Sequence, residues 1–338
     1  MNTLPIFGQP SEEQPQRLVG IAKIAAQSDI VDEGHNVEYF GIPVRSLLNK
    51  CASPRMPFDW TINPYRGCEF ACKYCYARYA HEFMELRDNR DFERKIFVKQ
   101  QAAWLLRQDL RQVKPGQSIS IGSATDPYQP IERRQFVTRS ILEVLAEYSG
   151  LSIGMVTKST LVTRDIDVLQ RLCERNSFQI YITVTTMNVD LARKLEPRAP
   201  RPDLRMEALS KLRQAGIHAG VLCAPVLPHI TDQASNIEAV VKAAKEAGAM
   251  SVSCNPLYLR PCSKSIFMPF VKEHFPHLVK LYEARYGEKA FVSKEYSRRV
   301  HKIVSTLCEK HEIGVRERMK RPVISTAAEP QMSLFRAG

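Results

Sequence analysis

Short apolar runs rich in β-branched residues alternate with amphipathic helical patterns along most of the chain, and this alternation is what most constrains the fold. Near-continuous apolar strands that alternate with helices are typical of a parallel sheet covered by helices, an α/β fold. Six such strands suit a partial βα barrel or a doubly wound sheet, and in both the chemistry sits at the carboxyl ends of the strands. The predicted strands are 60–65, 118–123, 151–157, 178–185, 217–224 and 250–259.

Helical periodicity follows each of the first five strands and returns twice beyond the last one. The predicted helices are 99–112, 138–148, 163–174, 188–195 with 204–214, 233–247, 268–285 and 295–310. Polar, Pro- and Gln-rich composition predicts a disordered start, and we expect a disordered tail as well. The predicted organisation is a disordered N-terminal lead (1–17), an N-terminal extension (18–57), the barrel core (58–260), a C-terminal helical basic region (261–318) and the disordered tail (319–338).

The charge balance adds a second constraint. The chain has 48 Lys and Arg residues against 36 Asp and Glu residues, a formal net charge of +12. An excess of this size favours an acidic partner such as nucleic acid. No apolar run approaches the roughly 20 residues that cross a bilayer, and the first residues do not resemble a secretion signal. We therefore expect a cytoplasmic protein with no membrane partner.

Three of the nine cysteines are clustered directly after the first predicted strand. Cys68, Cys72 and Cys75 form a C-x3-C-x2-C pattern, whereas the other six are scattered, as small buried side chains usually are. A structural zinc site needs four ligands, and His81 is a candidate for the fourth. A four-iron cluster bound by three thiolates would instead leave one iron free to bind another molecule. The spacing thus indicates a metal centre, with the iron–sulfur cluster favoured.

The segment NPYRGCEFACKYCYAR (63–78), with Tyr74 in the aromatic place, resembles the radical S-adenosylmethionine (SAM) superfamily. That resemblance implies a partial (βα)6 TIM-type barrel with parallel strands, followed here by C-terminal helices. It implies a [4Fe-4S] cluster on Cys68, Cys72 and Cys75, SAM bound to the open iron, and an external electron donor of the flavodoxin or ferredoxin type. The cofactors supply a 5′-deoxyadenosyl radical that abstracts a hydrogen atom.

A narrower resemblance, to the spore photoproduct lyase-like branch, rests on five segments between about residues 36 and 295. They are NPYRGCEFACKYCYAR, IGSATDPYQPIE (121–132), TKSTLVTRDIDVL (157–169), LEPRAP (195–200) and APVLPHITD (224–232). The resemblance implies that Thr125, Lys158 and Thr183 contact SAM. It also implies that Tyr74 contributes to binding of the cofactor. Tyr76 is implied to be a catalytic residue that takes part in the return of the radical.

The chain departs from that branch at Ser123, because the true lyase has a hydrogen-donating cysteine at this position. A serine O–H bond is far harder to break homolytically than a thiol S–H bond. Cys223 and Cys254 are the candidate substitutes, although both fit core positions better. Glu196 and Arg198 either line the barrel mouth or pair with each other.

Two further signals lie late in the sequence. The stretch from 294 to 321 is rich in Lys and Arg, which suits a solvated helix face or contact with phosphates. Gln331–Phe335, with the sequence QMSLF, resembles the pentapeptide by which bacterial repair proteins bind the sliding clamp.

The sequence therefore predicts a radical SAM enzyme that acts on damaged or modified DNA in a photoproduct lyase-like reaction. One alternative is a radical SAM enzyme that modifies RNA, a protein side chain or a small molecule. Another is a non-enzymatic iron–sulfur protein that transfers electrons or senses redox state.

Overall fold

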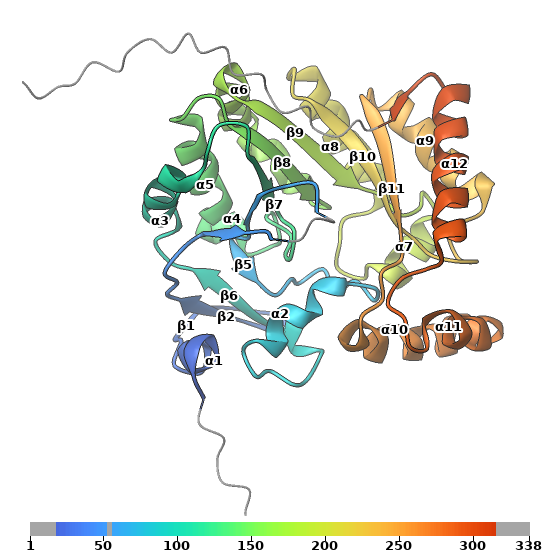
Figure 1. Ribbon diagram of the computed structural model, residues 1–338, viewed down its shortest axis with the longest axis horizontal. Helices are drawn as coiled ribbons and strands as arrows, with labels where there is room; N and C mark the ends of the chain where they lie inside the picture. The colour runs from blue at the N-terminus through green and yellow to red at the C-terminus, as the bar shows by residue number, and fades with distance from the viewer. Residues whose placement is uncertain (1–17, 53–55, 316–338) are drawn as a thin grey trace, which may run out of the picture.

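Six parallel strands form the centre of the main sheet in the computed structural model, which describes residues 18–52 and 56–315 (Figure 1). They are β4 (Trp60–Ile62), β7 (Ser118–Ile121), β8 (Ser152–Thr157), β9 (Ser177–Thr183), β10 (Ala219–Val226) and β11 (Ser251–Pro256). Each strand pairs in parallel with the next in chain order, which confirms the predicted partial (βα)6 barrel. β3 (Leu48–Lys50) extends one edge antiparallel, and β12 (Gly314–Val315) extends the other in parallel.

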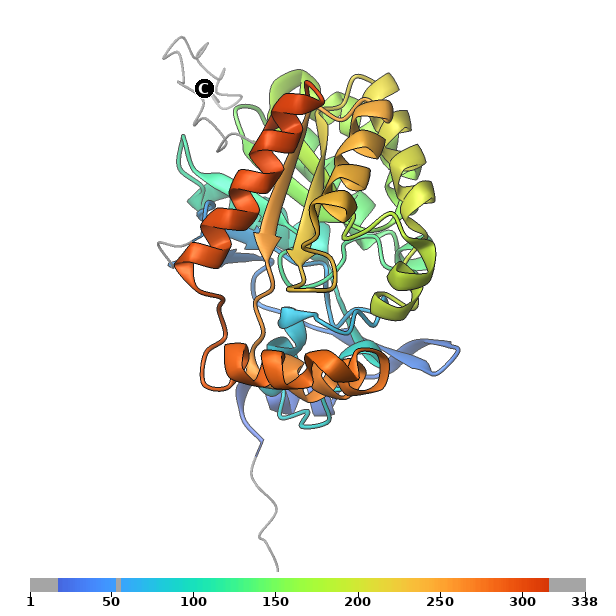
Figure 2. The ribbon, with the colours of Figure 1, turned by 90° about the vertical axis from the view of Figure 1, so that its right-hand side faces the viewer.

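Helices cover the outside of this sheet because each carries one apolar face. They are α3 (Ala102–Asp109), α5 (Val137–Ala146), α6 (Ile166–Arg175), α8 (Pro202–Gln214), α9 (Ala234–Glu246) and α12 (Lys294–Lys310). On α12, for example, Val300, Val304 and Leu307 are buried at helical spacing. These residues join the strands' buried residues in one continuous apolar core. Figure 2 shows α12 running along β11 at the edge of the barrel.

A second, four-stranded sheet lies beside the barrel, and the sequence patterns did not predict it. Its order is β1 (Ile30–Gly34), β2 (Val37–Ile42), β6 (Lys95–Lys99) and β5 (Tyr65–Arg66). The predicted strand 60–65 is therefore divided between two sheets. Pro64 has no N–H to donate to a ladder, so the chain leaves the barrel at Asn63–Pro64 and enters the second sheet.

The remaining helices lie at the ends of the fold. α7 (Val189–Leu195), α10 (Pro261–His274) and α11 (Val279–Tyr286) gather at the carboxyl ends of the strands (Figure 1). The predicted helix 268–285 is in fact two helices, because Phe275 leaves helical geometry and Pro276 follows it. Three short helices complete the set, namely α1 (Gly20–Ala26), α2 (Tyr79–Glu82) and α4 (Glu132–Gln135).

Apolar residues of α10 and α11 pack against the segment that carries the clustered cysteines. Phe267, Tyr282 and Tyr286 share one buried cluster with Phe70 and Leu195. In the described part of the chain, no helix is long and apolar enough to cross a membrane. The predicted lead (1–17) and tail (319–338) lie outside the described residues, and the domain boundaries between them stay predictions.

Candidate active site

The cysteine loop, residues 67–75, connects β5 to a short 3-10 helix at Tyr76–Arg78. Gly67 opens it with φ +85°, and a Cβ there would lie 2.8 Å from the carbonyl oxygen of Phe92, so only glycine fits. The Cys68 N–H donates to that same carbonyl at 2.9 Å, and the Lys73 N–H donates to the Leu195 carbonyl at 2.9 Å. The loop is thus fixed to two segments that are distant in sequence.

Four side chains donate to carbonyl oxygens of the cysteine loop, and one of them is Gln129, whose Nε2 donates to Gly67 at 3.3 Å. Thr125 Oγ1 donates to Gly67 at 2.6 Å, and Ser263 Oγ donates to Cys75 at 2.7 Å. A guanidinium nitrogen of Arg78 donates to the Cys72 carbonyl at 3.1 Å. The last three donors come from the segment after β7, from α10 and from the loop's own continuation, and they hold the loop in place.

Arg78 is fully buried and joins the cysteine loop to the segment 89–93. It donates to the carbonyl oxygen of Asn89 at 2.6 Å and forms an ion pair with Glu93. The guanidinium lies 5.6 Å from the centroid of the Phe92 ring. Its Nε is buried without a hydrogen-bond partner among the described residues. No sequence pattern distinguished this arginine beyond its place shortly after Cys75, the last of the three clustered cysteines.

The three thiols have the chemistry that an iron–sulfur cluster requires. Cys68 and Cys72 are buried and Cys75 is partly buried. Burial raises the pKa of all three, with that of Cys72 raised to about 12, so the thiols carry protons until a metal displaces them. Three thiols in one short loop, fixed by contacts to the rest of the fold, fit a [4Fe-4S] cluster with one open iron.

The alternative of a zinc site with His81 finds no support in the geometry. His81 Nε2 lies 2.9 Å from the Lys95 carbonyl oxygen, and its ring packs edge-on against Phe92 and Phe97. Within residues 18–52 and 56–315, no three His, Cys, Asp or Glu side chains are placed to hold a single metal ion.

The residues predicted to contact SAM lie at the ends of three adjacent strands. Thr125 follows β7, Lys158 follows β8, and Thr183 ends β9. The backbone N–H of Lys158 donates to Asp126 Oδ2 at 2.7 Å, and its Nζ lies 5.7 Å from the centroid of the Tyr74 ring. The fold therefore brings Lys158 to the cysteine loop, whereas the Thr125 hydroxyl is already engaged with the Gly67 carbonyl.

A buried polar network surrounds Lys158 and Tyr74. The Tyr74 hydroxyl donates to Glu196 and lies 3.2 Å from Thr185 Oγ1. Burial opposes the positive charge of Lys158, but the nearby Cys72 sulfur and Glu196 carboxylate raise its pKa overall. A charged ammonium beside the cluster loop can bind a carboxylate such as that of the methionine moiety of SAM.

Glu196 pairs with Arg205, not with Arg198. The Glu196 and Arg205 side chains are each 1% exposed, and Arg205 also donates to the carbonyl oxygens of Thr183 and Pro200 at 3.0 and 2.7 Å. Arg198 instead borders a separate cavity of about 710 Å³ beside β1 and β2. Sequence reasoning missed Arg205, because a lone arginine in a helix gives no sign that it turns inward.

Tyr76 lies beside Ser123, the residue that stands where the resemblance to the lyase would place a hydrogen-donating cysteine. Its hydroxyl donates to the backbone carbonyl oxygen of Ser123, and the side chain is 39% exposed. The Asn63 amide donates to the hydroxyl of Ser123 at 3.1 Å. A phenol thus lies next to both the cluster loop and the end of β7.

Cys223 and Cys254 are core residues. They are paired in register on β10 and β11, and they share the apolar core with Cys308 of α12. Burial raises the pKa of both Cys223 and Cys254 to about 12. Their location under α12 argues against either thiol as the substitute for the lyase cysteine.

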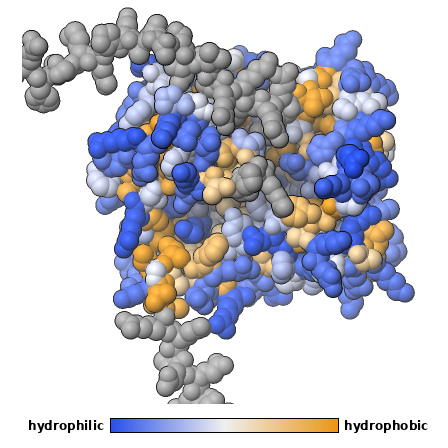
Figure 3. Space-filling model, in the orientation of Figure 1, coloured by the Kyte–Doolittle hydropathy of each residue, from blue (hydrophilic) through white to orange (hydrophobic). Residues whose placement is uncertain are grey.

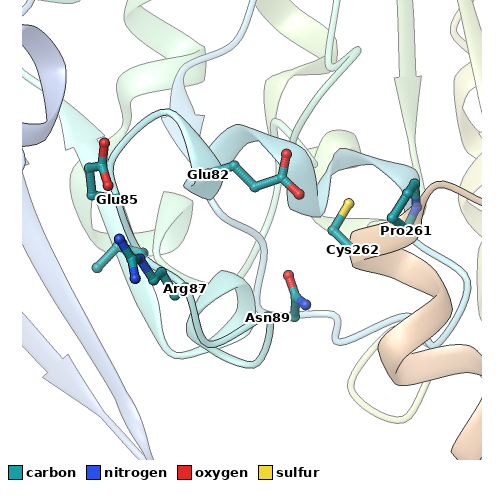
Figure 4. Close-up of a pocket in the computed structure, with 7 residues that line it drawn as sticks. Glu82, Glu85, Arg87, Asn89, Pro261 and Cys262 are labelled. Carbon is teal, nitrogen blue, oxygen red and sulfur yellow. The ribbon is translucent and has the colours of Figure 1, made fainter.

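Cys262 borders a cavity of about 460 Å³ on the outer side of the cysteine loop, between α2 and the start of α10. Figure 4 shows its thiol and the Glu82 carboxylate pointing toward each other. Burial raises the pKa of Cys262, and the neighbouring residue Ser263 supports Cys75. Cys262 therefore lies outside the cysteine loop and is separate from the three clustered thiols.

Taken with the partial parallel barrel, the three-thiol loop defines an iron–sulfur enzyme with its site at the carboxyl ends of the strands. Comparison with known proteins gives the same class. The Radical SAM superfamily model matches residues 62–253. The chain belongs to the radical SAM superfamily, is a radical SAM enzyme, and uses a [4Fe-4S] cluster and SAM as cofactors. A purely electron-transferring or redox-sensing role is thereby set aside.

Its relatives among curated proteins carry no assigned function. Uncharacterized protein Rv2578c of Mycobacterium tuberculosis is 30% identical over 304 residues, which cover 88% of each chain. Uncharacterized protein MJ0683 of Methanocaldococcus jannaschii is 30% identical over 196 residues, covering 58% of this chain and 70% of that protein.

Among solved structures, the fold is similar to that of spore photoproduct lyase. A mutant of that enzyme with bound AdoMet and dinucleoside spore photoproduct superposes with a TM-score of 0.61 at 15% identity, covering 82% of this chain and 80% of the other. The lyase complexed with dinucleoside spore photoproduct gives a TM-score of 0.60 at 16% identity, with the same coverage. At these identities the likeness establishes the fold.

Proposed function

We propose that this radical SAM enzyme acts on damaged or modified DNA in a lyase-like radical reaction. The observation that carries the proposal is the placement of Tyr76, which lies beside the cluster loop and is bonded to the Ser123 carbonyl at the end of β7. Together, the cluster and SAM supply a 5′-deoxyadenosyl radical for hydrogen abstraction. Cys68, Cys72 and Cys75 hold the cluster in this scheme, and Lys158, Thr183, Thr125 and Tyr74 form the side on which SAM binds.

Two observations favour DNA as the substrate. Structures of spore photoproduct lyase, which has a similar fold, contain a dinucleoside spore photoproduct, so a protein of this fold binds a nucleic acid lesion. In addition, the chain has a net charge of +12, and α12 presents Arg298 and Lys302 to solvent at the barrel edge. Figure 3 shows hydrophilic side chains interspersed with apolar patches on the face that it draws. Phosphate groups bind to exposed Lys and Arg side chains without sequence preference.

Tyr76 is the hydrogen-transfer residue in this proposal, because Ser123 cannot replace a thiol. The phenol would donate the hydrogen atom of its O–H bond to the substrate-derived radical, which leaves a tyrosyl radical on the residue. Transfer of a hydrogen atom from 5′-deoxyadenosine to the phenoxyl oxygen would return Tyr76 to its starting state and would regenerate the 5′-deoxyadenosyl radical. The ordinary pKa of a tyrosine, about 10, already keeps the phenol protonated at neutral pH, and desolvation raises the pKa of Tyr76 further. The Ser123 carbonyl fixes the direction of the O–H bond.

Two partners belong to the same proposal. An external reductant of the flavodoxin or ferredoxin type supplies the electron for SAM cleavage. Gln331–Phe335, which lies outside the described residues, binds the bacterial sliding clamp and brings the enzyme to DNA.

The second candidate is a radical SAM enzyme that modifies RNA, a protein side chain or a small molecule. It is favoured by one observation, that Ser123 stands where the lyase has its cysteine. A reaction in which the substrate-derived radical does not take its hydrogen atom from a thiol would need no cysteine there.

The decisive experiment incubates the anaerobic, cluster-loaded protein with SAM, dithionite and ultraviolet-irradiated DNA. Mass spectrometry then follows 5′-deoxyadenosine and the released nucleosides. We expect a photoproduct or modified nucleoside to decrease with wild-type enzyme, and we expect Tyr76→Phe to keep SAM cleavage while losing the nucleoside change. If SAM is cleaved but no nucleoside of irradiated DNA changes, DNA is not the substrate and the second candidate replaces it.

A further inference from the structure

Arg66 and Lys99 are two basic side chains that the fold places together, and neither forms a hydrogen bond or ion pair through its side chain with another described residue. They lie on β5 and β6, which pair antiparallel with Arg66 opposite Phe97. Because residues two apart on a strand share a face, Lys99 lies on the same face as Phe97 and Arg66. The two cations are therefore diagonal cross-strand neighbours, a separation that long side chains can span.

Neither side chain has a hydrogen-bond or ion-pair partner in the described part of the chain. Lys99 is only 4% exposed, and Nε of Arg66 is buried with no acceptor. Asp109, whose charge acts on Lys99, accepts three hydrogen bonds from the segment 46–48, all of them at Oδ2. Burial, together with the repulsion from Arg66, lowers the pKa of Lys99 to about 7. Among the described residues, Arg66 Nε therefore lacks an acceptor, and the charge on Lys99 is compensated only in part, by Asp109.

Buried charges without partners are costly, and native proteins keep them mainly where a ligand completes the set. An anion bound against Arg66 and Lys99 would relieve the repulsion between them and would satisfy the unpaired Arg66 Nε. The two side chains therefore have the properties of an anion-binding site.

A third cation lies beside the pair. The Arg260 guanidinium is 4.4 Å from the centroid of the Tyr79 ring. Burial raises the pKa of Tyr79, while Arg260 and Arg66 both oppose this rise, so both guanidinium groups lie close to the same phenol. Arg66, Tyr79 and Arg260 are each partly exposed, which gives an anion access from solvent. Arg66 is two residues before Cys68, so the site adjoins the cysteine loop.

We propose that Arg66, Lys99 and Arg260 form a binding site for a phosphate group of the nucleic acid substrate. The proposal rests on the proposed function, since the substrate strand brings the phosphate. Guanidinium groups match phosphate oxygens in a bidentate geometry, and the lysine beneath adds a point charge. Phosphate contacts of this kind fix the position of a strand and carry no sequence preference. The site thereby positions one nucleotide next to the cluster loop.

The first test replaces Lys99 with Met, which keeps the length of the side chain and removes its charge. In the cluster-loaded protein, Lys99→Met is expected to raise the melting temperature, because the repulsion with Arg66 is gone. The same variant is expected to bind a short fluorescent single-stranded DNA about tenfold more weakly, with a salt slope smaller by about one. Lys95→Met is the matched control, since Lys95 is on the same strand but pairs with Asp91 at 3.1 Å. It is expected to leave the DNA affinity unchanged.

Arg260→Gln provides a second variant at a partly exposed position that does not disturb the strands, and a similar loss of DNA affinity is expected. The proposal is overturned if Lys99→Met lowers the melting temperature and leaves the DNA affinity unchanged. Lys99 would then be a structural partner of Asp109.

A third arm of the experiment distinguishes a phosphate group of DNA from free phosphate as the bound anion. Inorganic phosphate is compared with sodium chloride at equal ionic strength in the melting experiment. A phosphate-induced rise that Lys99→Met abolishes, without any change in DNA affinity, would identify a site for free phosphate and overturn the nucleic acid assignment. These readouts need no turnover, so absence of a DNA product would count against the proposed function while leaving the binding result intact.

Discussion

At the scale of single residues, Arg78 shows how one buried side chain organises the site. Its guanidinium contacts the Cys72 carbonyl, the Asn89 carbonyl and the Glu93 carboxylate. Charge-assisted hydrogen bonds of this kind are stronger than neutral ones, and burial protects them from solvent screening. The position of the cysteine loop therefore depends on a contact network that reaches fifteen residues along the chain.

The thiol assignment gives the first prediction. Cys72→Ala should remove the brown colour and nearly all bound iron, because a cluster held by three thiolates loses one of its three protein ligands. Iron and sulfide analysis of anaerobically purified protein measures this. Cys173→Ala is the control, since Cys173 lies on α6, away from the loop. Full iron retention after loss of Cys72 would defeat the assignment.

Lys158→Met should weaken SAM binding by about ten- to a hundredfold, because one charge-assisted contact contributes roughly 1.5–3 kcal/mol. The cluster should be retained, since Lys158 approaches the loop only through its charge and the Tyr74 ring. Equilibrium dialysis with labelled SAM gives the affinity. The exposed Lys194 on α7 offers a comparison, and Lys194→Met should bind SAM normally. Equal affinities in the two variants would mean that Lys158 does not face the cofactor.

His81 predicts a pH dependence of stability. Burial lowers its pKa from 6.5 to about 4, so the folded protein keeps the ring neutral while the unfolded chain takes up a proton below pH 6.5. The unfolded state binds more protons between these values, and stability must therefore fall as the pH falls from 6.5 to 4. The loss from this residue is up to about 3 kcal/mol.

Urea unfolding at several pH values measures this effect. The variant His81→Gln should be less stable at pH 7 but should lose less stability between pH 6.5 and 4. A steeper acid dependence in the variant would contradict the assignment of a neutral His81.

At the scale of elements, α12 has two faces with different roles. Its inner face buries Val300 and Val304 against the barrel, and its outer face exposes Arg298 and Lys302. Replacing both Arg298 and Lys302 with Gln should weaken DNA binding and reduce the salt slope by about two, one for each phosphate contact. Helicity and melting temperature should change little, because neither side chain is buried.

Fluorescence anisotropy over a salt series tests this prediction of α12. Lys211→Gln on α8 removes a comparable exposed lysine that pairs with Glu207 at 2.7 Å. It should leave the salt slope as it is in the wild type. If the two basic positions on α12 behave like Lys211, the helix face is only a solvated surface.

The elements also show what sequence could and could not predict. The six barrel strands were predictable because parallel strands buried on both faces need continuous apolar runs. The second sheet was not, because β1 is mostly exposed and β5 has only two residues, so neither has a periodic pattern. At the site, the cysteine spacing indicated the metal centre directly. Arg205 and Lys99 could not be found, since their roles depend on burial that only the tertiary structure creates.

At the scale of the whole molecule, the catalytic barrel and the QMSLF peptide should act separately. Deletion of Gln331–Phe335 should abolish binding to the bacterial sliding clamp while cluster content and SAM cleavage stay unchanged. Within the peptide, Leu334 and Phe335 are the expected anchors, so replacing both with Ala is the sharper variant. Surface plasmon resonance on immobilised clamp gives the affinity. If the wild-type chain shows no measurable binding to the clamp, the clamp is not a partner of this protein.

The hydrogen bonds around the cysteine loop have a consequence for how the holoenzyme is made. Phe92, Leu195, Thr125, Ser263 and Arg78 fix the loop without any contribution from iron. Small zinc domains depend on the metal for their folding, whereas this loop is also held by hydrogen bonds to the rest of the fold. Cluster delivery should therefore be a late step that acts on a folded chain. A cell short of iron would accumulate intact but inactive protein, ready for activation when a cluster carrier becomes available.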